Sequence, residues 1–129
     1  MPQATFQQSY GLGTVTLACS FRGNGGSAIS SPVIRDGLAA MVDTVSRNAQ
    51  GVYYVNLKQK LGRCVSLVAM LNGDSATTVY VQDAEYDDTN KRITIRIVDA
   101  AGAAADPDAG VRFSVVGYFS PRSDLRDAA

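Results

Sequence analysis

Three acidic side chains at alternating positions are the residues of this sequence best suited to bind a metal ion. Asp83, Glu85 and Asp87 stand at every second residue, so in a β-strand they would share one face. Carboxylate oxygens are the hard ligands that Ca²⁺ prefers, but the spacing is not that of an EF-hand loop. Lys91 and Arg92 follow closely and balance the charge. We therefore expect a solvated strand end and no bound metal.

Few residues of this chain are of the types and spacing that catalysis requires. Histidine is absent, which excludes Ser-His-Asp and Cys-His catalysis and paired-histidine zinc sites. No two of the eleven Asp and one Glu stand out as the acid and base of a glycoside hydrolase. Asp106 and Asp108 flank Pro107 in a turn-like stretch, which favours a loop over a site. Glycine-rich residues 11–13 and 23–26 lack the Lys-Ser/Thr of a phosphate-binding loop. We therefore expect a protein that is not an enzyme and has no cofactor.

The charge balance bears on possible partners. The 12 basic and 12 acidic residues give a net charge of zero, whereas nucleic acids and anionic membranes are normally met by a basic excess. The one local basic group is Lys58, Lys60 and Arg63, around a turn that we predict to be a hairpin tip. No apolar run approaches the roughly 20 residues that cross a bilayer, and residues 1–11 show no signal-peptide pattern. We expect neither nucleic acid nor membrane as partner.

The cysteines and tyrosines have alternative roles. With only Cys19 and Cys64, and no visible export signal, we expect reduced thiols that pack as small apolar residues. The chain has six tyrosines and no tryptophan. Tyrosines can lie at subunit contacts, where an apolar ring with a polar tip is useful, but Tyr53 fits the core equally well.

Alternation of apolar and polar residues predicts the elements that must position these side chains. The pattern is clear in residues 14–21, 52–58, 92–97 and 111–119, and each predicts a half-buried strand. Residues 63–71 are apolar on both faces, which predicts a strand in the centre of a sheet. Further strands are expected within residues 77–86, 28–34 and 41–47, although residues 36–42 also suit a short helical turn.

Turn-forming residues separate the predicted strands. Asn72-Gly73 is a hairpin signal, and residues 100–110 suggest a long hairpin loop. Short, regularly spaced strands without intervening amphipathic helices predict an all-β fold, an antiparallel sandwich or jelly roll of about eight strands. The expected organisation is an N-terminal arm (residues 1–13), the β domain (14–119) and a C-terminal tail (120–129), because both ends are polar and punctuated by turn residues.

Residues 45–57 resemble a recurring segment of tailed-bacteriophage virion proteins. In those proteins a strand that ends in Arg leads through a polar turn and Gly to a Tyr-bearing strand that ends in Leu, as at Arg47, Gly51, Tyr53 and Leu57 here. The likeness extends over residues 41–123 as a succession of strand patterns and does not cover residues 1–40. It implies a virion surface protein of the capsid decoration (cement) or head-fibre type, made in the host cytoplasm and carried on the capsid surface. It supplies no catalytic residues.

On this resemblance we expect a structural protein that binds the major capsid protein on the outer surface of the shell and stabilises it. Such modules are commonly trimeric or clustered on a capsid symmetry axis. The alternative is a fibre domain that binds a host receptor or glycan through the loops at residues 23–27 and 100–110. The partner-contact residues that we predict lie in the two terminal segments, namely Gln3, Thr5, Phe6, Tyr10, Leu12, Pro121, Arg122 and Leu125.

Overall fold

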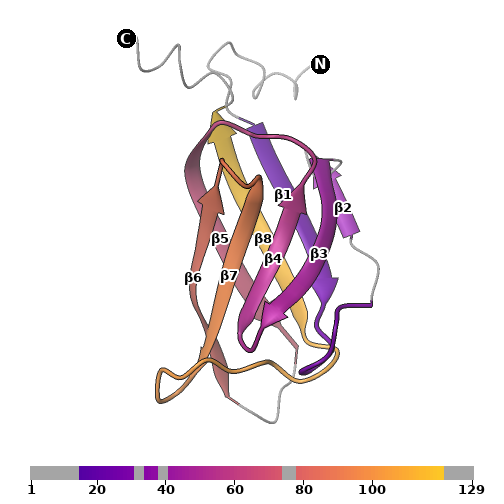
Figure 1. The fold of residues 1–129 in the computed structure, drawn as a ribbon, viewed down its shortest axis with the longest axis vertical. Coiled ribbons are helices and arrows are strands. Elements are labelled where there is room, and N and C mark those ends of the chain that lie inside the picture. Colours follow the sequence, from indigo (N-terminus) through magenta and orange to yellow (C-terminus); the bar gives the residue numbers. More distant parts are fainter. Residues whose placement is uncertain (1–14, 31–33, 38–40, 74–77, 121–129) are drawn as a thin grey trace.

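The computed structural model describes residues 15–30, 34–37, 41–73 and 78–120, and all of its named elements are β-strands. They form two antiparallel sheets packed face to face, so the predicted all-β sandwich is confirmed (Figure 1). The strands are β1 (Val15–Arg22), β2 (Ile34–Gly37), β3 (Val42–Ala49), β4 (Val52–Leu57), β5 (Arg63–Asn72), β6 (Val79–Asp87), β7 (Arg92–Asp99) and β8 (Arg112–Ser120).

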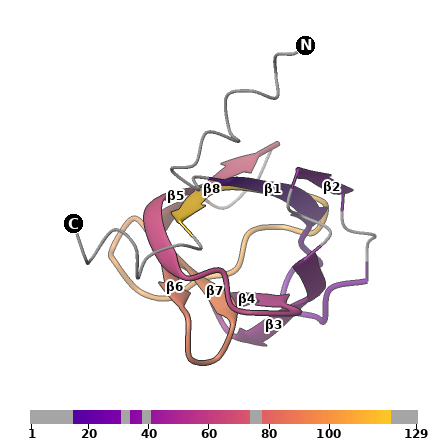
Figure 2. The same cartoon turned by 90° about the horizontal axis from the view of Figure 1, so that it is seen from above.

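The two sheets contain four strands each. Their orders are β2-β1-β8-β5 and β3-β4-β7-β6, and Figure 2 shows them as two layers seen from one end. β3–β4 and β6–β7 are hairpins within one sheet, whereas the chain crosses between the sheets after β2, β4, β5 and β7. Within the described residues, no helix is long and apolar enough to cross a membrane.

The core lies between the inner faces of the sheets, and the apolar residues of each alternating strand pattern point into it. Leu17, Ile95 and Val115 are fully buried, in agreement with the predicted faces of β1, β7 and β8. Phe113 stacks on Phe21 with ring centroids 4.8 Å apart, and the Tyr53 ring lies 4.6 Å from Phe113. The core role that we considered for Tyr53 is therefore confirmed.

β5 is an edge strand, and the prediction that it is central and buried on both faces is wrong. Val65, Val68 and Met70 are 60%, 51% and 49% exposed. The register with β8 shifts between Cys64 and Ser66, and this β-bulge turns Val65 outward and Cys64 toward the core. After the bulge Leu67, Ala69 and Leu71 lie against the core, while Val68 and Met70 face solvent.

Three predicted hairpin connections are crossovers between the sheets instead. The turn at residues 58–62 joins β4 to β5, the Asn72-Gly73 turn leads from β5 to β6, and residues 100–111 join β7 to β8. Each pair of strands belongs to different sheets. Local turn chemistry predicted the change of direction correctly, but it does not determine which sheet the next strand joins.

Other details differ in smaller ways. The strand expected within residues 28–34 is wrong for residues 28–30, which form no strand, and β2 covers Ile34–Gly37 instead. The helical turn considered for residues 36–42 falls partly outside the described residues. β8 ends at Ser120, one residue beyond the expected boundary of the tail. Cys19 is buried, Cys64 is half-buried, and neither forms a disulfide, in agreement with the expected thiol form.

Candidate functional site

The acidic row on β6 is partly neutralised by an arginine of the neighbouring strand. Arg96 Nη1 lies 3.0 Å from an oxygen of Asp83 and 3.4 Å from one of Glu85. Asp87 takes another partner, since the Asn90 side chain donates to it at 2.7 Å, and this bond lowers the pKa of Asp87. Among the described residues, no group of three or more potential ligands is placed to share a metal ion.

Arg96 adds to the two cations expected from the sequence, Lys91 and Arg92. Arg92 stands opposite Asp87 and contributes to the lowered pKa of that carboxyl. Arg92 lies over the Tyr54 ring, 4.2 Å from its centroid, and Lys91 occupies the turn with a positive φ of 57°. Arg96 stands opposite Asp83 in the β6–β7 register, and this pairing across the hairpin places its guanidinium between two carboxylates.

Calcium should leave the wild-type protein unaffected, because a guanidinium already occupies the space between Asp83 and Glu85. We expect the melting temperature in millimolar CaCl₂ to equal that in EDTA. Arg96→Ala should cost less than about 1 kcal/mol of folding stability, since both partners are about half exposed. Differential scanning calorimetry measures both quantities, and a melting temperature that rises with calcium would contradict the assignment.

A more deeply placed polar network surrounds Asp106. Its carboxylate accepts two hydrogen bonds from Arg47, at 3.1 Å from Nε and 2.8 Å from Nη2. The Gly51 backbone N–H donates to it at 3.0 Å, and the Tyr53 hydroxyl at 2.7 Å. Residue 106 lies in the β7–β8 crossover, whereas the other three belong to the β3–β4 hairpin. The network therefore fastens the crossover to the end of the sheet that contains β3, β4 and β7.

The electrostatics of this network favour the ionised carboxylate. Burial alone would raise the pKa of Asp106, but the bonds from Arg47, the Gly51 N–H and Tyr53 hold that pKa below its usual value. Burial and the neighbouring carboxylate raise the pKa of Tyr53, so its hydroxyl keeps its proton and stays a donor. All four groups satisfy one another, and this arrangement serves the fold.

A second tyrosine–aspartate pair holds the β4–β5 crossover, at the other end of the sandwich. The Tyr86 hydroxyl donates to Asp88 at 2.6 Å and accepts from the Leu61 N–H at 2.8 Å, and the Gly62 N–H donates to Asp88 at 3.2 Å. The Tyr86 ring also packs edge-on against Phe119, with centroids 5.0 Å apart. Residues 61 and 62 belong to the β4–β5 crossover, so each of these two crossovers is held by a Tyr–Asp contact.

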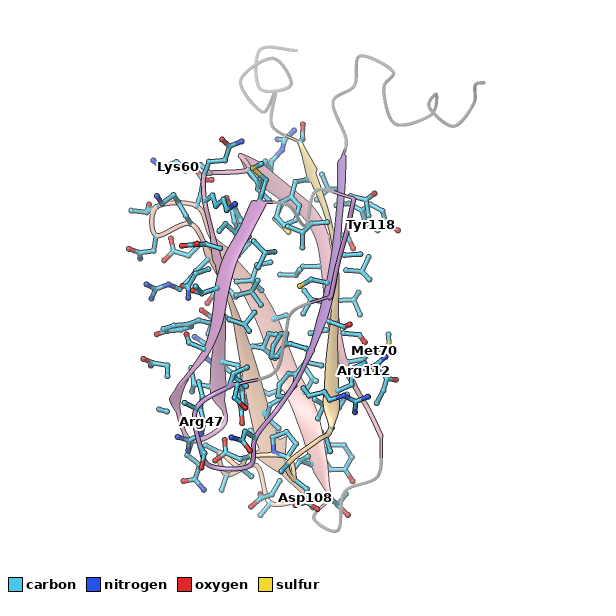
Figure 3. All side chains as sticks on the ribbon, turned by 90° about the vertical axis from the view of Figure 1, so that its right-hand side faces the viewer. Arg47, Lys60, Met70, Asp108, Arg112 and Tyr118 are labelled. Carbon is cyan, nitrogen blue, oxygen red and sulfur yellow. The ribbon has the colours of Figure 1, made fainter. Side chains whose placement is uncertain are left out.

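The surface best suited to a partner is the part of the outward side of β1, β8 and β5 that holds three rows of uncharged residues, which we call the uncharged outer face. The next row on the same side, Arg22–Arg112–Asn72, carries two arginines and bounds this face. Tyr118 is 43% exposed, and Figure 3 shows it projecting from the same side of the sandwich as Met70. The rows are Thr16–Tyr118–Ser66, Ala18–Val116–Val68 and Ser20–Ser114–Met70.

Strand geometry limits the area of this face to on the order of 300 Å². Patches of that size occur on ordinary monomers, while a specific protein interface buries about 800 Å² per partner. The face therefore needs additional contact area to hold a partner. The terminal segments join the sandwich beside it, because Val15 and Phe119 are paired neighbours in the sheet.

All eight predicted contact residues lie outside the described residues: Gln3, Thr5, Phe6, Tyr10, Leu12, Pro121, Arg122 and Leu125. The structure does show where the chain enters and leaves. β1 begins and β8 ends at one end of the sheet, and Arg63 of the predicted basic group pairs with Ser120 there. Lys60 lies at this same end of the molecule (Figure 3).

The two loops considered for receptor binding meet at the opposite end. The Gly23 N–H donates to the carbonyl of Val111 at 2.9 Å, and the Gly110 N–H donates to that of Gly23 at 3.0 Å. Figure 1 shows the long β7–β8 crossover passing across this end of the sandwich. The loops therefore form one surface, about the length of a strand away from the terminal attachments.

Comparisons with known proteins return no relatives for this chain. It matches no protein-family model, no curated protein and no solved structure.

Proposed function

We propose that this chain is a non-enzymatic structural protein of a virion, which binds the outer surface of a capsid and reinforces the contacts between capsid subunits. The observation that supports it best is the uncharged outer face on a sheet from whose one end both terminal segments extend. A compact sandwich would supply a rigid body, and the face and the segments together would supply the contact area. The major capsid protein is the proposed partner and the capsid surface the proposed location.

The proposed mechanism is mass action. A protein that binds the assembled shell and not the free subunits stabilises the shell by its binding free energy. Many copies, each bound weakly, add to a large effect because the shell presents many equivalent sites. The expected trimer or cluster on a symmetry axis belongs to this proposal. We also infer a sandwich built of hairpins rather than a jelly roll, since β3–β4 and β6–β7 pair with their chain neighbours inside one sheet.

Capsid disassembly tests the proposal. Shells of the phage that encodes this chain should lose their protein lattice at a higher temperature when the protein is bound, as followed by light scattering or intrinsic fluorescence. Tyr118→Lys should raise the protein concentration needed for this stabilisation at least about tenfold, because a charge would enter the uncharged outer face. Gln82→Lys, which adds the same charge at an exposed position on the other sheet, is the control. Shells that neither bind the protein nor change their disassembly temperature would exclude the function.

A fibre domain that binds a receptor or glycan is the second candidate. The observation that favours it is that the loops at residues 23–27 and 100–110 form one surface opposite the terminal attachments, as a fibre tip requires. A glycan array distinguishes the two functions. Binding at micromolar affinity, abolished by substitutions in these loops and unaffected by Tyr118→Lys, would support the fibre role over the capsid role.

A further inference from the structure

The four edge strands of the sandwich differ in how they are protected against pairing with another chain. β6 carries Asp83, Glu85 and a register shift after Val81, and β3 carries Asp43 with two register shifts. Charges and bulges of this kind prevent strand addition. β2 has only four residues. Three of the described edges are therefore charged, irregular or short.

β5 is the exception. It is the longest strand, with 10 residues, and it lacks a charged residue and proline between positions 64 and 72. Its one bulge lies at its beginning, and from Ser66 to Asn72 its register with β8 is regular. An edge strand presents unpaired backbone N–H and C=O groups along its open side. Residues 66–72 therefore offer an uninterrupted, uncharged template for a further strand.

A shallow apolar groove runs beside this edge. It has a volume of about 320 Å³ and is lined by residues 69–71 of β5 and 79–81 of β6, none of which is charged. Met70 and Tyr80 remain about half exposed there. A partner that lies along β5 would cover exposed apolar atoms as well as backbone groups, so the groove favours an uncharged, apolar strand as its occupant.

We propose that two copies of this chain associate through antiparallel pairing of their β5 strands, which joins two sheets into one continuous sheet across a twofold axis. The occupant that we assign is β5 of a second copy. The groove favours an uncharged, apolar strand, and β5 is itself uncharged, apolar and regular over residues 66–72. Pairing a neutral strand with itself brings no like charges together, whereas the same pairing of β6 would oppose carboxylates. The inference concerns the free protein and does not depend on the proposed capsid function.

The regular stretch also defines the register. A twofold axis at Ala69 pairs Ser66 with Asn72 of the second copy and uses all seven regular residues. In this register Val68 stands opposite Met70 of the second copy on the outer face, and Leu67 stands opposite Leu71 on the inner face. Both contacts are apolar, and each occurs twice because of the symmetry.

Sedimentation equilibrium and concentration-dependent hydrogen exchange on the full chain test the pairing. We expect a monomer–dimer equilibrium in the micromolar range, with amides of residues 66–72 exchanging more slowly as protein concentration rises. Val68→Lys should raise the dimer dissociation constant at least about tenfold, since it removes two symmetric apolar contacts and adds two charges near the axis. Gln82→Lys, on the exposed edge of β6, should leave the constant unchanged.

Several results would overturn the pairing. One is a wild-type protein that stays monomeric at every concentration. Another is slow exchange of residues 66–72 that does not depend on concentration, which would identify a segment of the same chain as the occupant. A third is an oligomer that Val68→Lys leaves intact. Circular dichroism shows whether each variant is folded, and the exchange experiment on the wild type needs no variant at all.

Discussion

Gly51→Ala, which adds one methyl group, should be the most destabilising substitution that we predict, lowering the free energy of unfolding by about 4 kcal/mol. Gly51 has a φ of +71°, a region that L-residues with a side chain rarely adopt. A Cβ there would lie 2.5 Å from the carbonyl oxygen of Ile97 and 2.9 Å from the backbone nitrogen of Ala105. Neither atom can move alone, because Ala105 donates to Ile97 at 3.2 Å and Ile97 donates to Gly51 at 2.8 Å.

The matched control for this substitution is Gly102→Ala. Gly102 also has a positive φ, of +89°, but an added Cβ there meets no atom within 4 Å. It should cost only the conformational strain, about 1–2 kcal/mol. Thermal and urea unfolding of both variants measures the difference. Equal losses would show that backbone conformation alone, and not the contact of the hairpin with the crossover, determines the effect.

Asp106→Ala should lower the free energy of unfolding by about 3 kcal/mol. The substitution leaves the guanidinium of Arg47, the Tyr53 hydroxyl and the Gly51 N–H without their acceptor. The Asp106 and Arg47 side chains are only 13% and 21% exposed, so water replaces the lost bonds poorly. Asp83→Ala is the control, because it also removes a carboxylate bound to an arginine, but at an exposed pair, and should cost less than about 1 kcal/mol.

The same carboxylate should make stability depend on acid pH. The pKa of Asp106 is lower in the folded protein than in the unfolded chain, so its contribution is complete above the unfolded value of about 3.9 and is lost as pH falls through the lower, folded value. Asp106→Asn removes this titration. Urea unfolding between pH 6 and pH 2 should show a smaller acid loss in Asp106→Asn than in the wild type, and parallel curves would contradict the assignment.

Alternation of apolar and polar residues predicted correctly those strands that have one face in the core and no irregularity. β1, β4, β7 and β8 have one face in the core and a regular alternation, and their inward residues were identified correctly. β5 was misplaced because apolar residues on both of its faces suggested a central strand, whereas its outer face, with Val68 and Met70, is exposed. The bulge at its start, which moves only Val65 and Cys64, leaves no distinctive residue type in the sequence. The edge position of β5 follows from the sheet order, which local patterns do not contain.

The polar networks were missed for a related reason. Asp106 precedes a proline in an alanine-rich stretch, where an aspartate is ordinarily a turn residue. Its partners lie 53 to 59 positions earlier in the chain. Only the path of the β7–β8 connection past the end of the sheet that holds β3, β4 and β7 brings them together. The position of Arg96 opposite Asp83 follows from the β6–β7 register in the same way and could have been tested from the hairpin pattern alone.

Labelling this protein on native particles tests the central claim most directly. Under the proposed capsid function, an antibody or gold label directed at the chain, viewed by electron microscopy on phage particles that carry it, should decorate the shell at many symmetry-related positions. A label confined to fibre tips, or particles that carry no label, would contradict a protein that reinforces the shell.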